Sequence, residues 1–172
     1  MALRQIFRRC SPMAAALAVL VLLAASSGHA QRAAKPGTFE SLSGAWSGTG
    51  TVHTSDGLHE RLRCKANYVV PAGGSKVELT LVCASDAYKF ELSSTIVQSG
   101  DSLSGYWSER THRVGGRIIG RMNGGQIEAR AEGDTFTALL TVGTHGSRQS
   151  FLMDSPGGKV SQVSIALARQ GQ

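Results

Sequence analysis

Turn signals recur at short intervals after residue 38 and divide the sequence into short segments. These signals are rich in glycine, serine, asparagine and aspartate, residues that favour tight turns because they tolerate positive φ angles or bond to their own backbone. They fall at residues 55–57, 72–75, 85–87, 99–101, 115–116, 123–125, 133–134, 143–146 and 156–158. Nine turns of this kind separate ten short segments.

Apolar and polar residues alternate within these segments, with the period of two that is typical of half-buried strands. Residues 61–70, 88–96, 127–132 and 163–167 show the pattern most clearly, and no segment after residue 38 has a convincing helical period. Strands joined by successive hairpins favour an up-and-down barrel, whose closure leaves no edge strand exposed. We therefore expect an all-β fold: an antiparallel up-and-down β-barrel of about ten strands.

Two cysteines test the register of this barrel. Cys64 and Cys83 lie symmetrically about residues 73–74, so a hairpin that turns there places them directly opposite each other. A loop of two or four residues preserves the pairing, and either gives a Cα separation suited to a disulfide. The same register brings together, on the apolar face, the pairs Ala66–Leu81, Tyr68–Leu79 and Val70–Val77. We predict a structural disulfide rather than a redox or metal-binding pair.

Residues 1–30 have the three regions of a secretory signal peptide. Arg4, Arg8 and Arg9 precede the apolar run 13–25, and the small residues of 26–30 follow it. The run is shorter than the roughly 20 residues of a membrane span, and Cys10 lies on the wrong side of it for a lipoprotein. We expect a signal-peptide helix, cleavage after Ala30, and a periplasmic or secreted product with no integral membrane segment.

Composition limits what the exported chain can do. Residues 1–30 hold 3 of the 18 Lys and Arg and none of the 12 Asp and Glu, so 15 minus 12 leaves a charge of +3. A charge this small does not favour nucleic-acid binding, which needs a dense basic face. We expect residues 31–38 to form a flexible lead-in and residues 39–169 to form a single barrel domain.

A short repeat marks two strand beginnings. Residues 41–47 recur as residues 102–108 with one difference, and in each copy a glycine precedes an inward tryptophan by two residues. We interpret both copies as places where backbones approach closely, which glycine permits.

The segment 44–50 has the pattern G-x-W-x-G-x-G. It resembles the opening of the calycin-like barrels, in which lipocalins begin with Gly-x-Trp and nitrobindin-type barrels with the longer form. The nitrobindin resemblance implies haem held by a histidine near the last strand. Residues 159–169 contain no histidine, and Gln162 stands about where such a ligand would fall. We therefore expect no haem or other cofactor. Small secreted proteinase inhibitors are also barrels with one disulfide, which keeps an inhibitor hypothesis open, with residues 31–37 as a possible inserting segment.

The predicted lumen is the leading candidate site. Small inward residues (Gly48, Gly50, Ala66, Gly105 and Ala129) alternate with large ones, and ten-strand barrels are wider than eight-strand barrels, whose interiors side chains nearly fill. The large inward residues are Trp46, Tyr68, Phe90, Trp107, Phe136 and Leu140. They predict either a packed core or a pocket for an apolar ligand.

Other candidates concern the outer surface. His53, Asp56 and His59 flank the first hairpin and form a weak candidate zinc site, although short surface turns rich in His and Asp are far more often simply solvated. Two basic stretches, one of Arg61, Arg63 and Lys65 and one of Arg113, Arg117 and Arg121, are consistent with charged strand faces that maintain solubility or contact anionic envelope components.

No catalytic motif is present, and pairs such as Glu109 with His112 or His145 with Ser147 need proximity that a sequence does not give. The sequence predicts a non-enzymatic, exported barrel that binds a small, mostly apolar molecule. A barrel that acts through a protein partner, such as a protease inhibitor, and a structural envelope protein without a ligand remain the alternatives.

Overall fold

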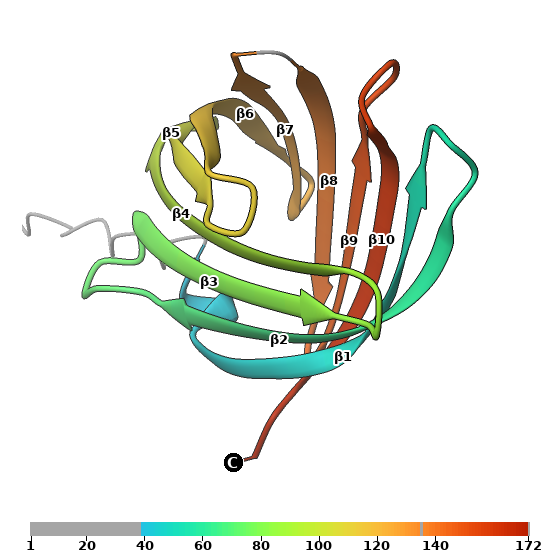
Figure 1. Ribbon diagram of the computed structural model, residues 1–172. Coiled ribbons are helices and arrows are strands. Elements are labelled where there is room, and N and C mark those ends of the chain that lie inside the picture. Colours follow the sequence, from blue (N-terminus) through green and yellow to red (C-terminus); the bar gives the residue numbers. More distant parts are fainter. Residues whose placement is uncertain (1–38, 135, 172) are drawn as a thin grey trace, which may run out of the picture. The chain divides into compact units, whose positions relative to one another are not determined.

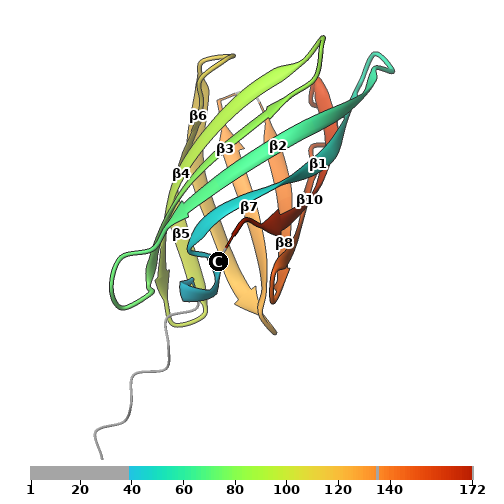
Figure 2. The same cartoon turned by 90° about the horizontal axis from the view of Figure 1, so that it is seen from below.

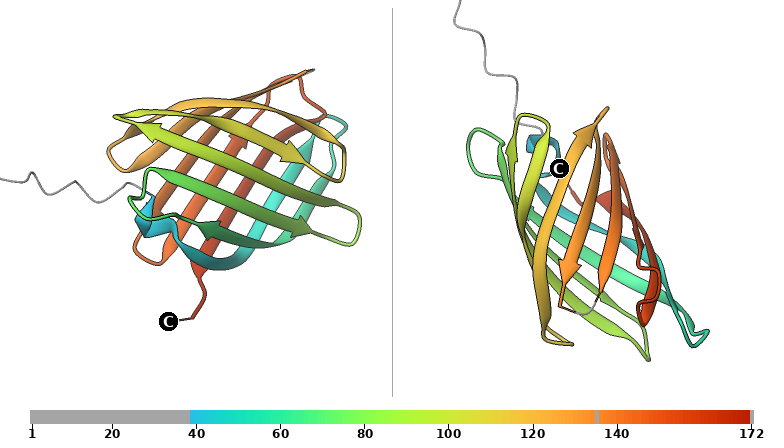
Figure 3. Two further views of the ribbon diagram at one scale, coloured as in Figure 1. Left: turned by 90° about the vertical axis from the view of Figure 1, so that its left-hand side faces the viewer. Right: turned by 90° about the horizontal axis from the view of Figure 1, so that it is seen from above.

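The computed structural model describes residues 39–134 and 136–171, which form a closed antiparallel barrel of ten strands (Figure 1). A short 3-10 helix, η1 (Glu40–Leu42), precedes them. The strands are β1 (Gly44–Thr54), β2 (His59–Val69), β3 (Lys76–Ala84), β4 (Lys89–Ser99), β5 (Ser102–Glu109), β6 (Val114–Asn123), β7 (Gln126–Gly133), β8 (Thr137–His145), β9 (Arg148–Asp154) and β10 (Val160–Arg169). Each strand pairs with the next, and β10 pairs with β1 to close the wall, which Figure 3 shows from two further sides.

The predicted fold class, an up-and-down barrel of about ten strands, is confirmed. The predicted signal peptide with its helix and cleavage site, and the predicted lead-in of residues 31–38, lie outside the described residues. Within the described part of the chain, no helix is long and apolar enough to cross a membrane.

The period-two alternation of the sequence becomes the two faces of the wall. In β2, Leu62, Cys64, Ala66 and Tyr68 are buried, and the residues between them are exposed. Burying alternate side chains on one face is what fixes the register of a strand, because a slip of one residue would turn the apolar set outward.

One predicted turn is wrong. Gly115 and Gly116 lie inside β6, and the hairpin turns instead at residues 110–113, where Arg113 takes a positive φ of 56°. A Cβ on Gly116 would lie 1.7 Å from the carbonyl oxygen of Glu132 on β7, a distance that no side chain tolerates. Glycine is therefore required at position 116 because β6 and β7 approach closely there, and not because the chain turns.

The same constraint corrects our interpretation of the small inward residues. A Cβ on Gly48 would lie 1.9 Å from the carbonyl oxygen of Ala166, and one on Gly105 would lie 2.0 Å from that of Thr95. Neighbouring backbone occupies these positions, so the two glycines let strands bend together and do not open space for a ligand. At Gly105 the close approach expected from the repeat is confirmed, whereas Gly44 is required by its positive φ of 110°.

One end of the barrel is closed by packed side chains. Phe39 and Leu42, from the start of the described chain, are buried together with Trp46. The indole Nε1 of Trp46 donates a hydrogen bond to the carbonyl of Leu42 at 2.8 Å. Figure 2 shows η1 and the end of β10 at this same end of the barrel.

We call Phe39, Leu42 and Trp46 the plug. Arg169, the last residue of β10, holds the plug in place. Its guanidinium carbon lies 4.3 Å from the centre of the Trp46 ring, and its two terminal nitrogens donate to the carbonyls of Ser41 and Ser43. A cation over an aromatic face is attractive, by about 0.5–2 kcal/mol. One side chain thus ties the last strand to the first and to η1. We define this end, with the loops β2–β3, β4–β5, β6–β7 and β8–β9, as the closed end.

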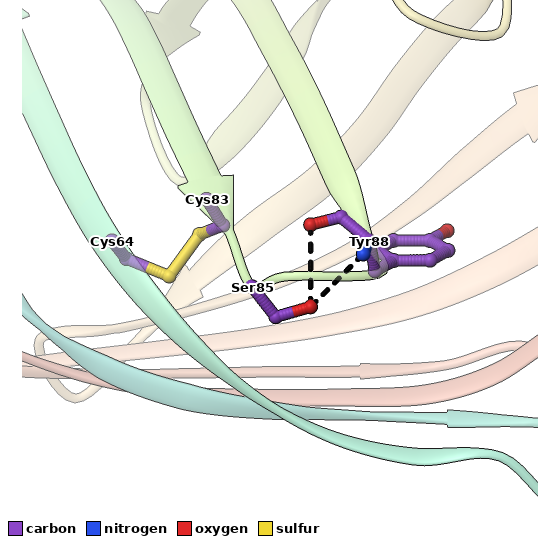
Figure 4. The surroundings of a disulfide bond; sticks show 4 residues. All are labelled: Cys64, Cys83, Ser85 and Tyr88. Carbon is purple, nitrogen blue, oxygen red and sulfur yellow. Dashed lines mark hydrogen bonds between the residues drawn. A yellow bond between two sulfur atoms is a disulfide. The ribbon is translucent and has the colours of Figure 1, made fainter.

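The predicted disulfide is confirmed. Cys64 and Cys83 are directly opposite in β2 and β3, with their Cα atoms 4.1 Å apart and both side chains on the inward face. The predicted pairs Ala66–Leu81 and Tyr68–Leu79 are also observed, but the strands end at Val69 and begin at Lys76, so Val70 lies in a six-residue loop, longer than we expected. Figure 4 shows the disulfide just before the β3–β4 turn, where the Ser85 hydroxyl accepts a hydrogen bond from the Tyr88 N–H at 2.9 Å.

Replacing both cysteines by alanine, in the variant Cys64→Ala/Cys83→Ala, should lower the free energy of unfolding by about 3 kcal/mol, because the cross-link restricts the unfolded chain. Urea denaturation of the variant measures this loss. Wild-type protein unfolded in the presence of a reductant is the control, and it should show the same shift of the midpoint. Unchanged midpoints in both samples would mean that the bond contributes nothing to stability.

Candidate functional site

The half of the lumen away from the closed end contains a cavity of about 400 Å³. It opens toward the loops β1–β2, β3–β4, β5–β6, β7–β8 and β9–β10, which we define as the open end. Its walls are apolar and come from β3, β4, β5, β6, β9 and β10 and from the β7–β8 connection: Leu81, Phe90, Leu92, Trp107, Val114, Phe136, Phe151, Met153, Val160 and Val163. Its mouth is polar: Thr54, Tyr88, Glu109, His112, Ser155, Gly157, Gly158 and Lys159.

Aromatic rings form two contacts in this cavity. The rings of Trp107 and Phe136 lie with their centres 5.4 Å apart, and those of Tyr88 and Phe90 are edge-to-face at 6.2 Å. Such geometries are favourable for aromatic pairs and hold the rings in defined positions. An apolar, partly enclosed cavity with a few polar groups at its mouth is the usual character of a small-molecule site.

Glu109 organises the mouth of the cavity. Its carboxylate is almost fully buried and accepts four hydrogen bonds: from the backbone N–H groups of Glu91, Thr111 and His112, at 2.8, 2.9 and 2.7 Å, and from Nδ1 of His112 at 2.7 Å. These donors lie on β4 and in the β5–β6 turn. The carboxylate therefore fixes this turn against the neighbouring strand.

Burial by itself raises the pKa of Glu109, but the hydrogen bonds from Glu91, His112 and Thr111 outweigh it and lower that pKa to about 2. The negative charge adds to the effect of burial on its neighbour Tyr88, whose pKa is raised. The ring of Tyr88 also lies against that of His112, with centres 5.9 Å apart.

The six predicted lumen residues all face inward but divide between two regions. Phe90, Trp107 and Phe136 line the cavity. Trp46 and Tyr68 lie at the closed end, where the Tyr68 hydroxyl donates to the Gln149 side chain at 2.5 Å. Leu140 packs against the cluster around Trp107 without lining the cavity.

The weak zinc candidate at the first hairpin is not assembled. The rings of His53 and His59 lie together, with centres 4.1 Å apart, but the Asp56 carboxylate accepts a hydrogen bond from the Thr54 hydroxyl, which lowers the pKa of Asp56. Among residues 39–134 and 136–171, no group of three His, Cys, Asp or Glu side chains could hold a metal ion.

Gln162 does not occupy a ligand position in the lumen. It belongs to the outward set of β10, opposite His53 on β1, and its amide donates to the Asp154 carboxylate at 2.8 Å. Because its side chain points away from the lumen, Gln162 does not fit the role of a ligand to haem held inside the barrel.

The two basic stretches differ in their surroundings. Arg117 and Arg121 pair with Glu132 and Glu128 of β7, at 3.1 and 3.0 Å, and Arg113 lies in the β5–β6 turn. Arg61, Arg63 and Lys65 form an exposed row on the outer face of β2. Arg117 and Arg121 are thus neutralised by acidic partners, whereas the row on β2 presents its charge to solvent.

Of the two side-chain pairs that sequence reasoning considered for catalysis, the structure brings Glu109 and His112 together. Both carboxylate oxygens are already occupied by the backbone of the turn, so the pair is explained by its role in the loop. His145 ends β8 at the closed end of the barrel, away from the cavity.

A second hollow, of about 470 Å³, lies on the outer surface over small side chains of β1, β9 and β10. It is larger but shallow, and Ser47, Thr49, Ala166 and Ala168 form much of it. The lumen cavity encloses a ligand better, which makes it the stronger candidate site.

Sequence reasoning missed the polar mouth. Glu109 continues the inward series of Leu103, Gly105 and Trp107, and a carboxylate at an inward position was the signal for a buried acid. Tyr88 begins the predicted alternating segment 88–96 and lies just before β4, but alternation did not show that it would lie at the mouth of the cavity.

Neither a protein-family model nor a curated protein matches this sequence. A solved structure does resemble it: the S-type phycobiliprotein lyase CPES from Guillardia theta, at a TM-score of 0.54 and 10% sequence identity, over 78% of this chain and 91% of that chain. A likeness at such low identity shows the fold alone. The two proteins therefore share a barrel fold, and no sequence match supports the G-x-W-x-G-x-G pattern as a family signature.

Glu109→Gln should lower the free energy of unfolding at pH 7 by about 2 kcal/mol, because an amide cannot replace a charged acceptor of four hydrogen bonds. The pKa of Glu109 is about 2 in the folded state, against an ordinary value of 4.5. Its contribution is therefore complete above about pH 4.5 and is lost as the pH falls toward 2. Chemical denaturation of both proteins between pH 7 and pH 2.5 measures this. The difference in free energy of unfolding between wild type and variant should become smaller as the pH falls.

The matched control is Glu78→Gln, which removes an exposed carboxylate paired with Lys76 and should cost little at any pH. The role of Glu109 would be contradicted if the loss of unfolding free energy in Glu109→Gln did not change with pH. It would also be contradicted if that loss were no larger than the loss in Glu78→Gln.

Proposed function

We propose that this protein binds a small, mostly apolar molecule in the open half of its barrel and does not transform it. The observation that carries the proposal is the cavity of about 400 Å³, with apolar and aromatic walls and a polar mouth. Burial of apolar ligand surface is favourable by about 25 cal/mol per Å², so a ligand of drug-like size has enough surface for useful affinity.

The shared barrel fold supports the proposal at the level of the scaffold. The similar structure belongs to a phycobiliprotein lyase, and its name describes that protein only. A second support is the arrangement of Glu109: its carboxylate oxygens are engaged by the turn that they hold. A group occupied in this way is better suited to shape the mouth than to exchange protons with a substrate.

We further propose that the barrel works in the periplasm or outside the cell. The buried disulfide is the structural support, because such bonds persist in oxidising compartments. The predicted signal peptide agrees with it. The protease-inhibitor alternative would act through a protruding hairpin loop or through residues 31–37, which lie outside the described part of the chain, and the cavity gives that function no support.

The neutral dye N-phenyl-1-naphthylamine tests the proposal. It should bind with one-to-one stoichiometry in native mass spectrometry, and its fluorescence should rise on binding. Leu92→Trp places an indole in the cavity and should weaken dye binding at least about tenfold, since the added bulk removes the space for a ligand.

Ser93→Trp is the matched control, because Ser93 is the next residue on β4 and is exposed on the outer face. It should leave dye affinity unchanged. Absence of binding to the wild-type protein, or equal affinity for wild type and Leu92→Trp, would refute binding in the lumen.

A further inference from the structure

The shallow hollow on the outer surface has a floor of small side chains. Its volume is about 470 Å³, and it lies over β1, β9 and β10, of which β1 and β10 are side by side in the wall (Figure 2). The outward residues of this floor are Ser47, Thr49, Ser150, Ala166 and Ala168. Three of them carry hydroxyl groups, which can both donate and accept hydrogen bonds. Because none of these side chains is long, a ligand can lie close to the backbone of the strands.

Positively charged side chains border this floor on both sides. Lys65 of β2 is directly opposite Ser47 of β1, Ser47 is opposite Ala168 of β10, and Ala168 is opposite Arg148 of β9. Arg63 lies two residues before Lys65 on the same exposed face of β2. Neighbouring strands are about 4.8 Å apart, so the backbones of β2 and β9 are about 14 Å apart along the wall. We call the hollow, together with these three cations, the outer groove.

The protein does not neutralise the cations of the outer groove. Within residues 39–134 and 136–171, Arg63, Lys65 and Arg148 form no ion pair. In contrast, Arg117 and Arg121 on β6 are paired with glutamates of β7. The strands between the cations, β1 and β10, contain no Asp or Glu. The outer groove therefore presents positive charge that an anionic ligand can neutralise.

The shape of the outer groove favours a thin, extended ligand. A membrane surface is flat, so it would contact the ends of the exposed cations and leave the hollow between them empty. Nucleic acid requires a denser basic face than three cations provide. A polysaccharide chain is thin enough to lie in the hollow, and its hydroxyl groups can bond to those of Ser47, Thr49 and Ser150.

We propose that the outer groove binds an acidic polysaccharide. Carboxylates of the sugars contact the cations on the two sides, and the sugar rings lie over the small side chains of β1 and β10. Ion pairs at exposed positions are individually weak, so binding needs several contacts and weakens as salt is added. The outer groove is on the opposite face of the wall from the lumen, so this inference does not depend on the proposed function.

Hexagalacturonate, a linear chain of six sugars that each carry a carboxylate, tests the proposal by isothermal titration calorimetry at low ionic strength. It should bind the wild-type protein, and its affinity should fall as salt is added. The fully methyl-esterified hexamer has the same sugars without the charges. It should bind at least about tenfold more weakly, because the charge-assisted hydrogen bonds to Arg and Lys are lost.

Arg63→Gln/Lys65→Gln removes both cations on the β2 side and should weaken binding of hexagalacturonate about fivefold. Arg148→Gln, on the other side, should weaken it about twofold to threefold. The matched control is Arg117→Gln/Arg121→Gln, which changes the net charge as much as the β2 variant does but lies on β6. It should change the affinity by less than about twofold. Equal losses in the β2 variant and this control would refute recognition at the outer groove.

Nuclear magnetic resonance locates the bound sugar on the wild-type protein without any substitution. Backbone amide signals of β1 and β10, including those of Thr49 and Ala166, should move with hexagalacturonate concentration and saturate. The signal of Tyr106, which is exposed on the outer face of β5, should stay in place. Saturable shifts confined to strands other than β1, β2, β9 and β10 would contradict the proposal.

Two further probes separate an acidic polysaccharide from other anionic partners. Hexaglutamate has six side-chain carboxylates on a peptide and should bind at least about threefold more weakly than hexagalacturonate. Equal affinity would mean that charge alone is recognised and would overturn the assignment of a polysaccharide. Binding to phosphatidylglycerol vesicles without binding to hexagalacturonate would overturn it in favour of a membrane surface. Failure of hexagalacturonate to bind would refute the proposal, while dye binding in the lumen would still decide the proposed function.

Discussion

The contact of Arg169 with Trp46 and η1 determines where this barrel is full and where it is open. The guanidinium lies on the indole and bonds to two carbonyls of the segment that leads into β1, and the indole bonds to Leu42. A barrel of ten strands is wide enough to leave internal space, so side chains must be brought in to fill one end. Because the plug fills the closed end, the remaining space lies at the other end, under the loops that carry Tyr88, His112 and Lys159.

The repeated heptapeptide shows how context gives one sequence two roles. In residues 41–47 the leucine belongs to η1 and accepts the proton of its tryptophan, which makes Trp46 part of the plug. In residues 102–108 the whole segment is strand, and the leucine carbonyl takes no part in such a bond. The second tryptophan therefore reaches the cavity wall with its donor unpaired. One indole therefore helps to close the barrel, and the other lines the cavity.

The fold could be predicted from the sequence because two independent patterns agreed. Alternation defined which residues face inward, and the symmetric placement of Cys64 and Cys83 about residues 73–74 fixed one register. Glycine misled us at Gly115 and Gly116, since turns and close strand approach both demand glycine, and only coordinates show that the Glu132 carbonyl fills the place of a side chain.

The site was predicted only in part, for a physical reason. Alternation shows that a side chain faces inward but gives no height along the barrel axis, so Trp46 and Trp107 looked equivalent. The heights depend on the plug, whose key residue Arg169 lies more than a hundred residues from its partners in sequence. Hydrogen bonds such as those of Glu109 depend on backbone groups from β4 and a turn, which a pattern of residue types does not reveal.

The most direct test of this account follows the two indole N–H groups by nitrogen-15 NMR while N-phenyl-1-naphthylamine is added. The chain has two tryptophans, so each signal can be assigned by a single substitution. The account predicts that the Trp107 signal moves with dye concentration and saturates, while the Trp46 signal, held in the plug by Leu42 and Arg169, stays in place. A shift of the Trp46 signal with Trp107 unmoved, or saturable dye binding that moves neither, would contradict a ligand site in the open half of the barrel.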